Sequence, residues 1–136
     1  MLPKTHIILG ALFSIILFFF GVNYFNCILV FLSSFLIDFD HYLWYIIRKK
    51  DFNLKNAYYT LKGTEKKKLY LMVFHTIEFL LFILLLSYLW KGFLWIFIGM
   101  VFHSILDLIE LYKEKELTFR EFLLIKYIFS DKKNYA

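Results

Sequence analysis

Eight ionisable side chains interrupt otherwise apolar stretches of this chain, and most of them are of types that bind metal ions. They are His6, Asp38, Asp40, His41, His75, Glu78, His103 and Asp107. Imidazoles and carboxylates are the usual protein ligands of Zn²⁺, Mn²⁺ and Fe²⁺. Three of the four histidines have a carboxylate three or four positions away, a spacing that brings both groups to one face of a helix. The set therefore favours a metal-binding or proton-handling site over independent structural hydrogen bonds.

The rest of the sequence narrows the chemistry that such a site can perform. Cys27 is the single cysteine, which excludes an intrachain disulfide and a cysteine-based metal site. No nucleophile elbow and no glycine-rich phosphate loop occurs. Water activated by a divalent metal is then the available nucleophile. Asp38, Asp40 and Glu78 are the candidate catalytic residues, as general bases.

The composition indicates the environment in which these groups lie. Hydrophobic residues make up 61% of the 136 positions, with 18 Phe and 10 Tyr. Soluble domains contain about 45–50% apolar residues, and a chain this short buries only a modest share of its surface. The composition therefore predicts an integral membrane protein.

Four apolar segments are predicted to form helices, at residues 5–20, 27–47, 69–89 and 93–112. Three of them approach the roughly 20 residues that cross a bilayer, and the first is expected to tilt or extend. The predicted fold is all-α: a four-helix integral membrane bundle over 1–112, followed by a cytoplasmic tail over 113–136. In the tail, Thr118 and Glu121 have capping-box spacing ahead of a short amphipathic helix, which either lies on the membrane or packs against the bundle.

The basic residues predict how the bundle is oriented. All of the 16 Lys and Arg residues except Lys91 fall on one side of the four predicted segments, which is the cytoplasmic side by the positive-inside rule. Both termini are then cytoplasmic, in a multi-pass protein of the cell (inner) membrane. Topology accounts for the basic run within 48–68, so a nucleic-acid partner is not expected.

The predicted depths of the polar groups agree with one another. At a helical rise of about 1.5 Å per residue, Asp40, His75 and Asp107 lie about 9–12 Å inside the cytoplasmic boundary. Because the segments alternate in direction, this agreement does not follow from sequence order. His6 lies closer to the boundary, so either its helix starts deeper in the membrane or the site opens toward the cytoplasm at that point.

The ordered set His6, Asp38-x-Asp40-His41, His75 and His103-x-x-x-Asp107 resembles the membrane-bound metal-dependent hydrolase family, also described as LexA-binding, inner-membrane-associated hydrolases. That family is distantly similar to zinc-dependent phospholipase C and related nucleases, in which His/Asp clusters hold several metals and cleave phosphoesters. This chain departs from it at Ile37, where a Pro is usual. It departs again in a His-Arg-Gly-x-Thr-His stretch, of which only His75 remains. Glu78 is expected to compensate for the missing group.

The resemblance implies a hydrolase acting on a phosphoester of a lipid or small amphiphile at the cytoplasmic leaflet. One or two divalent metals, zinc first and manganese or iron next, would be held by His6, Asp38, Asp40, His41, His75, His103 and Asp107. An alternative is a carrier or binding protein for metal ions or protons, and another is a structural membrane protein. Membrane lipids are the expected partners, and the carrier would need to be an oligomer.

Overall fold

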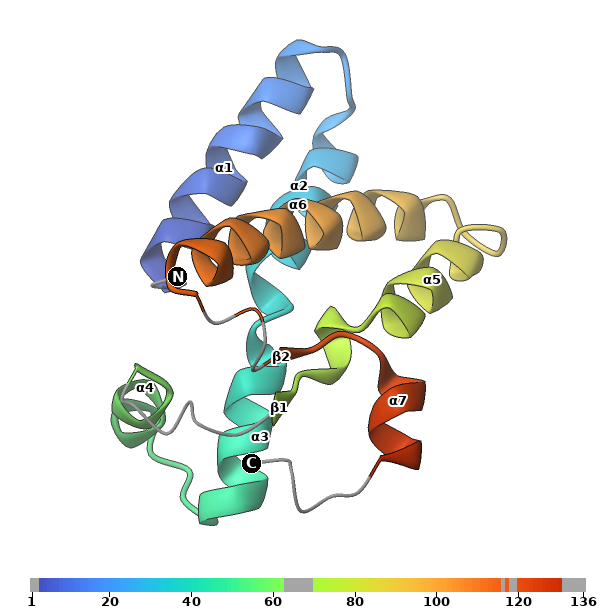
Figure 1. The fold of residues 1–136 in the computed structure, drawn as a ribbon. Coiled ribbons are helices and arrows are strands. Elements are labelled where there is room, and N and C mark those ends of the chain that lie inside the picture. The colour runs from blue at the N-terminus through green and yellow to red at the C-terminus, as the bar shows by residue number, and fades with distance from the viewer. Residues whose placement is uncertain (1–2, 63–69, 116, 118–119, 131–136) are drawn as a thin grey trace.

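The computed structural model describes residues 3–62, 70–115, 117 and 120–130, and the regular secondary structure in this part of the chain is helical except for two very short strands (Figure 1). The elements are α1 (Pro3–Phe19), α2 (Tyr24–Leu36), α3 (Phe39–Lys49), α4 (Leu54–Lys62), β1 (Tyr70–Leu71), η1 (Val73–His75), α5 (Ile77–Leu86), α6 (Gly92–Lys113), β2 (Arg120–Glu121) and α7 (Leu124–Phe129). The predicted helical class is confirmed.

Helix α2 lies at the centre and packs against both α1 and α6. A tight turn joins α1 to α2: Gly21 adopts a φ of +88°, and the side chain of Asn23 caps α2 by accepting from the amide of Asn26. Figure 1 shows the start of α1 beside the end of α6, although about 100 residues separate them in the sequence. This return brings His6 next to the second half of α6.

Small residues allow the backbones of these helices to approach closely. A Cβ at Gly99 of α6 would collide with the carbonyl oxygen of Val30 and with Ser33, both on α2. A Cβ at Gly10 of α1 would collide with Ser34, also on α2. Glycine and serine at such crossings are typical of helices that associate without a hydrophobic driving force between them. An apolar cluster at Ile37, Ile83 and Met100 joins α5 to the same core.

The second predicted segment, 27–47, is not one uninterrupted helix. It divides into α2 and α3 at a tight turn, where the amide of Asp38 bonds to Phe35 O and the amide of His41 bonds to Asp38 O. Such three-residue hydrogen bonds tighten the helix. The turn falls within the Asp38-x-Asp40-His41 motif, so it changes the direction in which those side chains project.

The third predicted segment, 69–89, is helical only in its second half. Residues 70–71 form β1, η1 follows, and α5 begins after Thr76, whose hydroxyl caps it by accepting from Phe79 N. With 10 residues, α5 is about 15 Å long, roughly half the thickness of a hydrocarbon core. In the described residues two helical stretches, Tyr24–Lys49 and Gly92–Lys113, are long and apolar enough to cross a membrane.

The tail is tied to the start of α5. Strands β1 and β2 pair in parallel, with Tyr70 opposite Arg120 and Leu71 opposite Glu121. The amide of Ile77 then donates to Phe122 O at 3.0 Å. The predicted capping box is wrong, because Glu121 lies in β2 and α7 begins only at Leu124. Thr118 lies outside the described residues. The start of α7 is attached to α5 through Glu78, and α7 has no buried residue, so both predicted placements of the tail helix remain open.

We expect Gly99→Ala to destabilise the protein by about 1–3 kcal/mol, the usual cost of overpacking a tight contact. The added methyl group meets a backbone carbonyl, which cannot rotate away as a flexible side chain can. Thermal unfolding in detergent measures the effect, and Ile105→Ala, at a half-exposed position of α6, is the control. Equal melting temperatures for the Gly99 variant and the wild type would contradict the packing described.

The turn between α3 and α4 predicts a pH dependence. Asp51 accepts hydrogen bonds from Tyr45 OH at 2.6 Å, Asn56 Nδ2 at 2.8 Å and Asn53 N at 2.9 Å, and these bonds lower the pKa of its carboxyl group. The bonds therefore stabilise the turn above the unfolded pKa of about 3.9 and are lost as the pH falls through the lower, folded value. Tyr45→Phe should raise the midpoint of the Asn53 amide shift in an NMR titration, and an unchanged midpoint would refute this account.

Candidate metal centre

Four side chains from three separate parts of the chain converge on one point. Asp38 comes from the turn between α2 and α3, His75 from η1, and His103 and Asp107 from successive turns of α6. One ligand atom from each lies within 4.8 Å of the others. These residues, which were predicted to lie at a similar depth, thus form a cluster. The turn before α3 directs Asp38 into it, and η1 directs His75.

The nitrogen–oxygen distances within this cluster are close to those between the ligands of a small metal ion. His103 Nε2 lies 3.3 Å from Asp38 Oδ1 and 3.6 Å from Asp107 Oδ2. His75 Nε2 lies 3.8 Å from Asp38 Oδ1 and 3.6 Å from Asp107 Oδ2. A tetrahedron with metal–ligand bonds of about 2.0–2.1 Å has edges of about 3.3–3.4 Å. The four nitrogen–oxygen distances are therefore within about half an ångström of such edges, and all ligand atoms lie within 4.8 Å of one another.

Both imidazoles are oriented with Nε2 toward the centre of the cluster. Nδ1 of His103 lies 2.7 Å from the carbonyl oxygen of Ser34, and since a carbonyl only accepts, Nδ1 carries the proton. Nδ1 of His75 lies 3.1 Å from Asp40 Oδ2, which orients it in the same way. Among the residues that the structure describes, neither Nε2 has a hydrogen-bond partner. Two buried imidazoles with a fixed Nδ1 and an unpartnered Nε2 are the arrangement found around metals.

Asp40 supports the cluster from outside rather than facing its centre. Its Oδ2 accepts from the backbone amide of Phe74 at 3.0 Å as well as facing His75 Nδ1. These contacts fix both the His75 ring and the backbone of η1. Asp40 was expected both as a ligand and as a base, and the geometry favours the orienting role.

His6 and His41 flank the centre on opposite sides. His6 Nε2 lies 3.2 Å from Asp107 Oδ1, and its ring stacks on that of His103 with centroids 4.1 Å apart. With Asp107 and Glu110, His6 forms a second group of atoms close enough to hold a metal. His41 Nε2 lies 3.5 Å from Asp38 Oδ1, and a third group contains His41, Asp40 and His75. All seven predicted metal-site residues therefore lie in this region.

Glu78 is not part of the cluster. Its two carboxylate oxygens accept from the backbone amides of Leu124 and Ile125, at 2.9 and 3.1 Å. The residue therefore caps α7 and anchors the tail, which is a structural role rather than the predicted catalytic one.

Arg120 also contacts the cluster, although the sequence pattern did not predict it there. Its Nη1 lies 2.8 Å from Asp107 Oδ2, and its side chain is 4% exposed. Arg120 belongs to β2, beyond the last predicted membrane segment, where it was counted only as one of the cytoplasmic charges. The residue type could have indicated a special role, because Arg120 is one of only two arginines in a chain whose other Lys and Arg positions are lysines.

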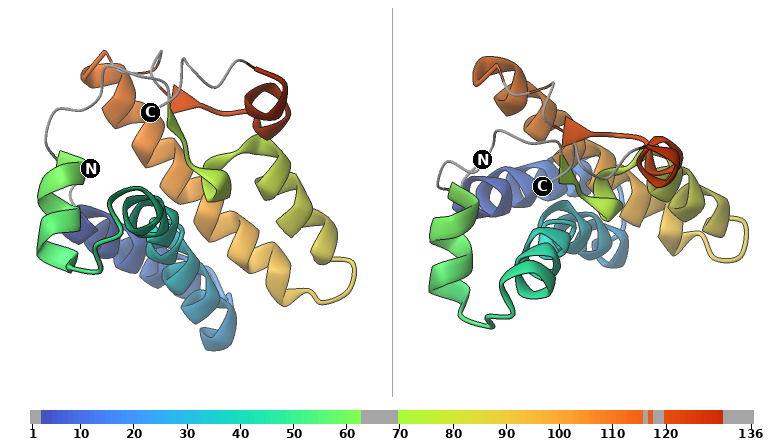
Figure 2. Two further views of the ribbon diagram at one scale, coloured as in Figure 1. Left: turned by 90° about the horizontal axis from the view of Figure 1, so that it is seen from below. Right: turned by 60° about the horizontal axis from the view of Figure 1, so that its bottom comes forward.

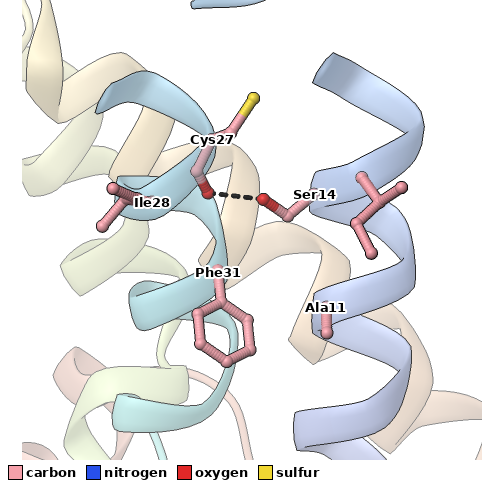
Figure 3. A pocket seen from close by; sticks show the side chains of 6 residues that line it. Ala11, Ser14, Cys27, Ile28 and Phe31 are labelled. Carbon is pink, nitrogen blue, oxygen red and sulfur yellow. Dashed lines mark hydrogen bonds between the residues drawn. The ribbon is translucent and has the colours of Figure 1, made fainter. Parts of the chain in front are cut away.

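The cluster is accessible from one side. Asp38 and His41 have side chains 26% and 24% exposed, whereas those of His6, His75, His103 and Asp107 are 9% exposed or less. An apolar pocket of about 240 Å³ lies elsewhere, between α1 and α2, and Figure 3 shows Ser14 donating to the carbonyl of Cys27 across it. That pocket has no imidazole, carboxylate or basic group among its lining residues, so the polar cluster is the candidate for metal chemistry.

Comparison with known proteins adds no information: no family model, curated protein or solved structure matches this chain.

The orientation of His75 by Asp40 is testable through metal affinity. Asp40→Asn keeps an acceptor for Nδ1 but removes the charge, and we expect divalent-cation affinity to fall about 10- to 100-fold, as for other residues that orient metal-bound histidines. Competition with a chromogenic chelator measures the change. Asp51→Asn, the same substitution outside the cluster, should leave affinity unaltered, and equal affinities for both variants would contradict the orienting role.

Proposed function

We propose that this protein is a multi-pass membrane protein whose buried His/Asp cluster binds zinc and hydrolyses a phosphoester of a lipid or small amphiphile at the cytoplasmic leaflet. The observation that carries the proposal is the convergence of Asp38, His75, His103 and Asp107, with both Nε2 atoms lacking a hydrogen-bond partner.

The exposed apolar surface supports a location in a membrane. Only 33% of the apolar window in Tyr24–Lys49, and 28% of that in α6, is buried inside the protein. In a soluble protein, most of the surface of a core helix is buried by the rest of the protein, which is not the case for these two helices. Phe19 and Phe20, at the end of α1, are each 83% exposed. A bilayer solvates this surface, which water would not.

The arrangement of the turns supports four segments with both termini on one side. In the left view of Figure 2, the turn between α5 and α6 lies at the lower end of α6, and α7 and the last turns of α6 lie at the upper end. The first of these ends holds Lys91, and the second holds Lys113 and Arg120. This agrees with the positive-inside rule. The short α5 requires the non-helical residues before it to lie within the protein-filled part of the membrane.

Zinc fits the centre best among the divalent metals considered. The ligand atoms are nitrogens and carboxylate oxygens, which zinc prefers, and the four nitrogen–oxygen distances of 3.3 to 3.8 Å are close to the edges of a zinc tetrahedron. A zinc ion supplies Lewis acidity and lowers the pKa of a water that it binds to about 7. Manganese and iron accept the same ligand types but favour higher coordination numbers.

The residues of this chain can divide the remaining tasks. Asp38 is the one of the three predicted bases that both faces the centre and reaches the open side, so it is placed to accept a proton from water. Asp107 Oδ2 is shared with Arg120, which leaves the fourth coordination position weakly held. A catalytic zinc site needs such an open position. The resemblance to membrane-bound metal-dependent hydrolases, and the expected access from the cytoplasmic leaflet, point to a phosphoester as substrate.

Metal content and turnover, measured on the same preparation, test this proposal. Detergent-purified protein should contain stoichiometric zinc and hydrolyse a phosphoester, and His103→Ala should lose both. His103 contributes a ligand and is held by the backbone of α2, so no neighbouring group replaces it. Ile105→Ala, two residues away and half exposed, should retain both properties.

Two results would count against hydrolysis. Absence of turnover on phosphomonoesters and phosphodiesters with zinc, manganese and iron would exclude the reaction. Uptake of zinc into proteoliposomes, lost in Asp40→Asn, would instead identify the carrier considered from the sequence.

A further inference from the structure

Arg120 is a buried cation placed inside the metal cluster, and one hydrogen bond does not account for it. Its side chain is 4% exposed, and its hydrogen bond among the described residues runs from Nη1 to Asp107 Oδ2. Its Nε is buried without a partner. A guanidinium offers five N–H donors, and leaving a buried donor unsatisfied is costly. The position therefore requires a further acceptor.

The tail holds Arg120 firmly in this place. Strand β2 pairs with β1, and the carbonyl oxygen of Phe122 accepts from Ile77 N. The Glu78 carboxylate accepts from the amides of Leu124 and Ile125. The start of α5 thus holds the backbone on the C-terminal side of Arg120 through three hydrogen bonds. Such support is typical of a functional side chain that must keep its orientation.

Metal binding would make more of this guanidinium available. Asp107 Oδ2 is both the acceptor of Arg120 and one of the four atoms that surround the centre. A cation at the centre competes with Arg120 for that oxygen, and it leaves two positive groups side by side. An anion that bridges them satisfies both, and a phosphoryl group suits the planar guanidinium fork because it accepts two parallel hydrogen bonds.

We propose that Arg120 binds the phosphoryl oxygens of the substrate beside the metal, so that the acceptor missing from its Nε is the substrate itself. This inference rests on the proposed function, since it assigns one more contact to the same site. The phosphoryl group comes either from a lipid headgroup or from a soluble phosphoester, and the two share this recognition chemistry.

Nitrogen NMR of the arginine side chains tests the contact directly. The chain has two arginines, Arg120 and the exposed Arg48, so two Nε resonances are expected, and Arg48→Lys assigns them. Inorganic phosphate added to the zinc-loaded, full-length protein in detergent should shift the Arg120 resonance and leave that of Arg48 in place. The proposal is overturned if the Arg120 resonance shifts neither with inorganic phosphate nor with the phosphatidic acid nanodiscs described below.

Variants separate this inference from the proposed function. Arg120→Ala should keep its zinc while its phosphate affinity falls about 10- to 100-fold, the usual loss when a hydrogen bond to a charged group is removed. Arg120→Lys keeps the charge but not the two parallel N–H donors, so its phosphate affinity should lie between those of the wild type and Arg120→Ala. Arg48→Ala should have the phosphate affinity of the wild type. Unchanged phosphate affinity in Arg120→Ala overturns the role of Arg120, whereas absence of zinc from the wild type overturns the metal centre itself.

The same NMR measurement in nanodiscs distinguishes a lipid headgroup from a soluble phosphoester as the source of the phosphoryl group. Phosphatidic acid in phosphatidylcholine, compared with phosphatidylcholine alone, should shift the Arg120 resonance if the headgroup is the ligand. A shift with inorganic phosphate but not with phosphatidic acid identifies a soluble phosphoester. A shift with phosphatidic acid alone identifies the lipid.

Discussion

Asp107 is the residue that the rest of the structure is arranged to satisfy. Its Oδ1 faces His6 of α1, and its Oδ2 faces His75 of η1, His103 of its own helix and Arg120 of β2. A buried carboxylate that loses its partners costs several kcal/mol. Helices surrounded by lipid gain little hydrophobic energy from packing against one another. In the proposed membrane setting, this polar centre therefore supplies cohesion that an apolar core supplies in a soluble protein.

The irregular backbone follows from the same requirement. A straight helix over the second segment would project Asp38 and Asp40, two residues apart, toward different sides. The turn at Asp38 instead brings Asp38 to the centre and leaves Asp40 behind His75, where it also binds the amide of Phe74. Each break in helical hydrogen bonding thus lies beside the cluster, where side chains and the tail supply replacement partners.

The sequence predicted those features that depend on local pattern. Helices α1 and α6 have nearly the predicted bounds, because long apolar runs with clear ends determine them. The residues of the cluster were identified because charge is rare within such runs. The break before Asp38, the late start of α5 and the role of Glu78 depend on contacts between distant segments, which no local pattern contains. Arg120 was overlooked for that reason: β2 carries it back to a centre built by residues that precede it by 13 positions or more.

The charge of the centre is compatible with a divalent cation. Three carboxylates, Asp38, Asp40 and Asp107, face one guanidinium, so two negative charges remain if the imidazoles are neutral. The Nδ1 atoms of His75 and His103 are directed to Asp40 and to Ser34 O. Their Nε2 atoms face the carboxylates of Asp38 and Asp107 at 3.3 to 3.8 Å. Two imidazole nitrogens and two carboxylates directed at one point are the ligand set that a divalent metal ion would use.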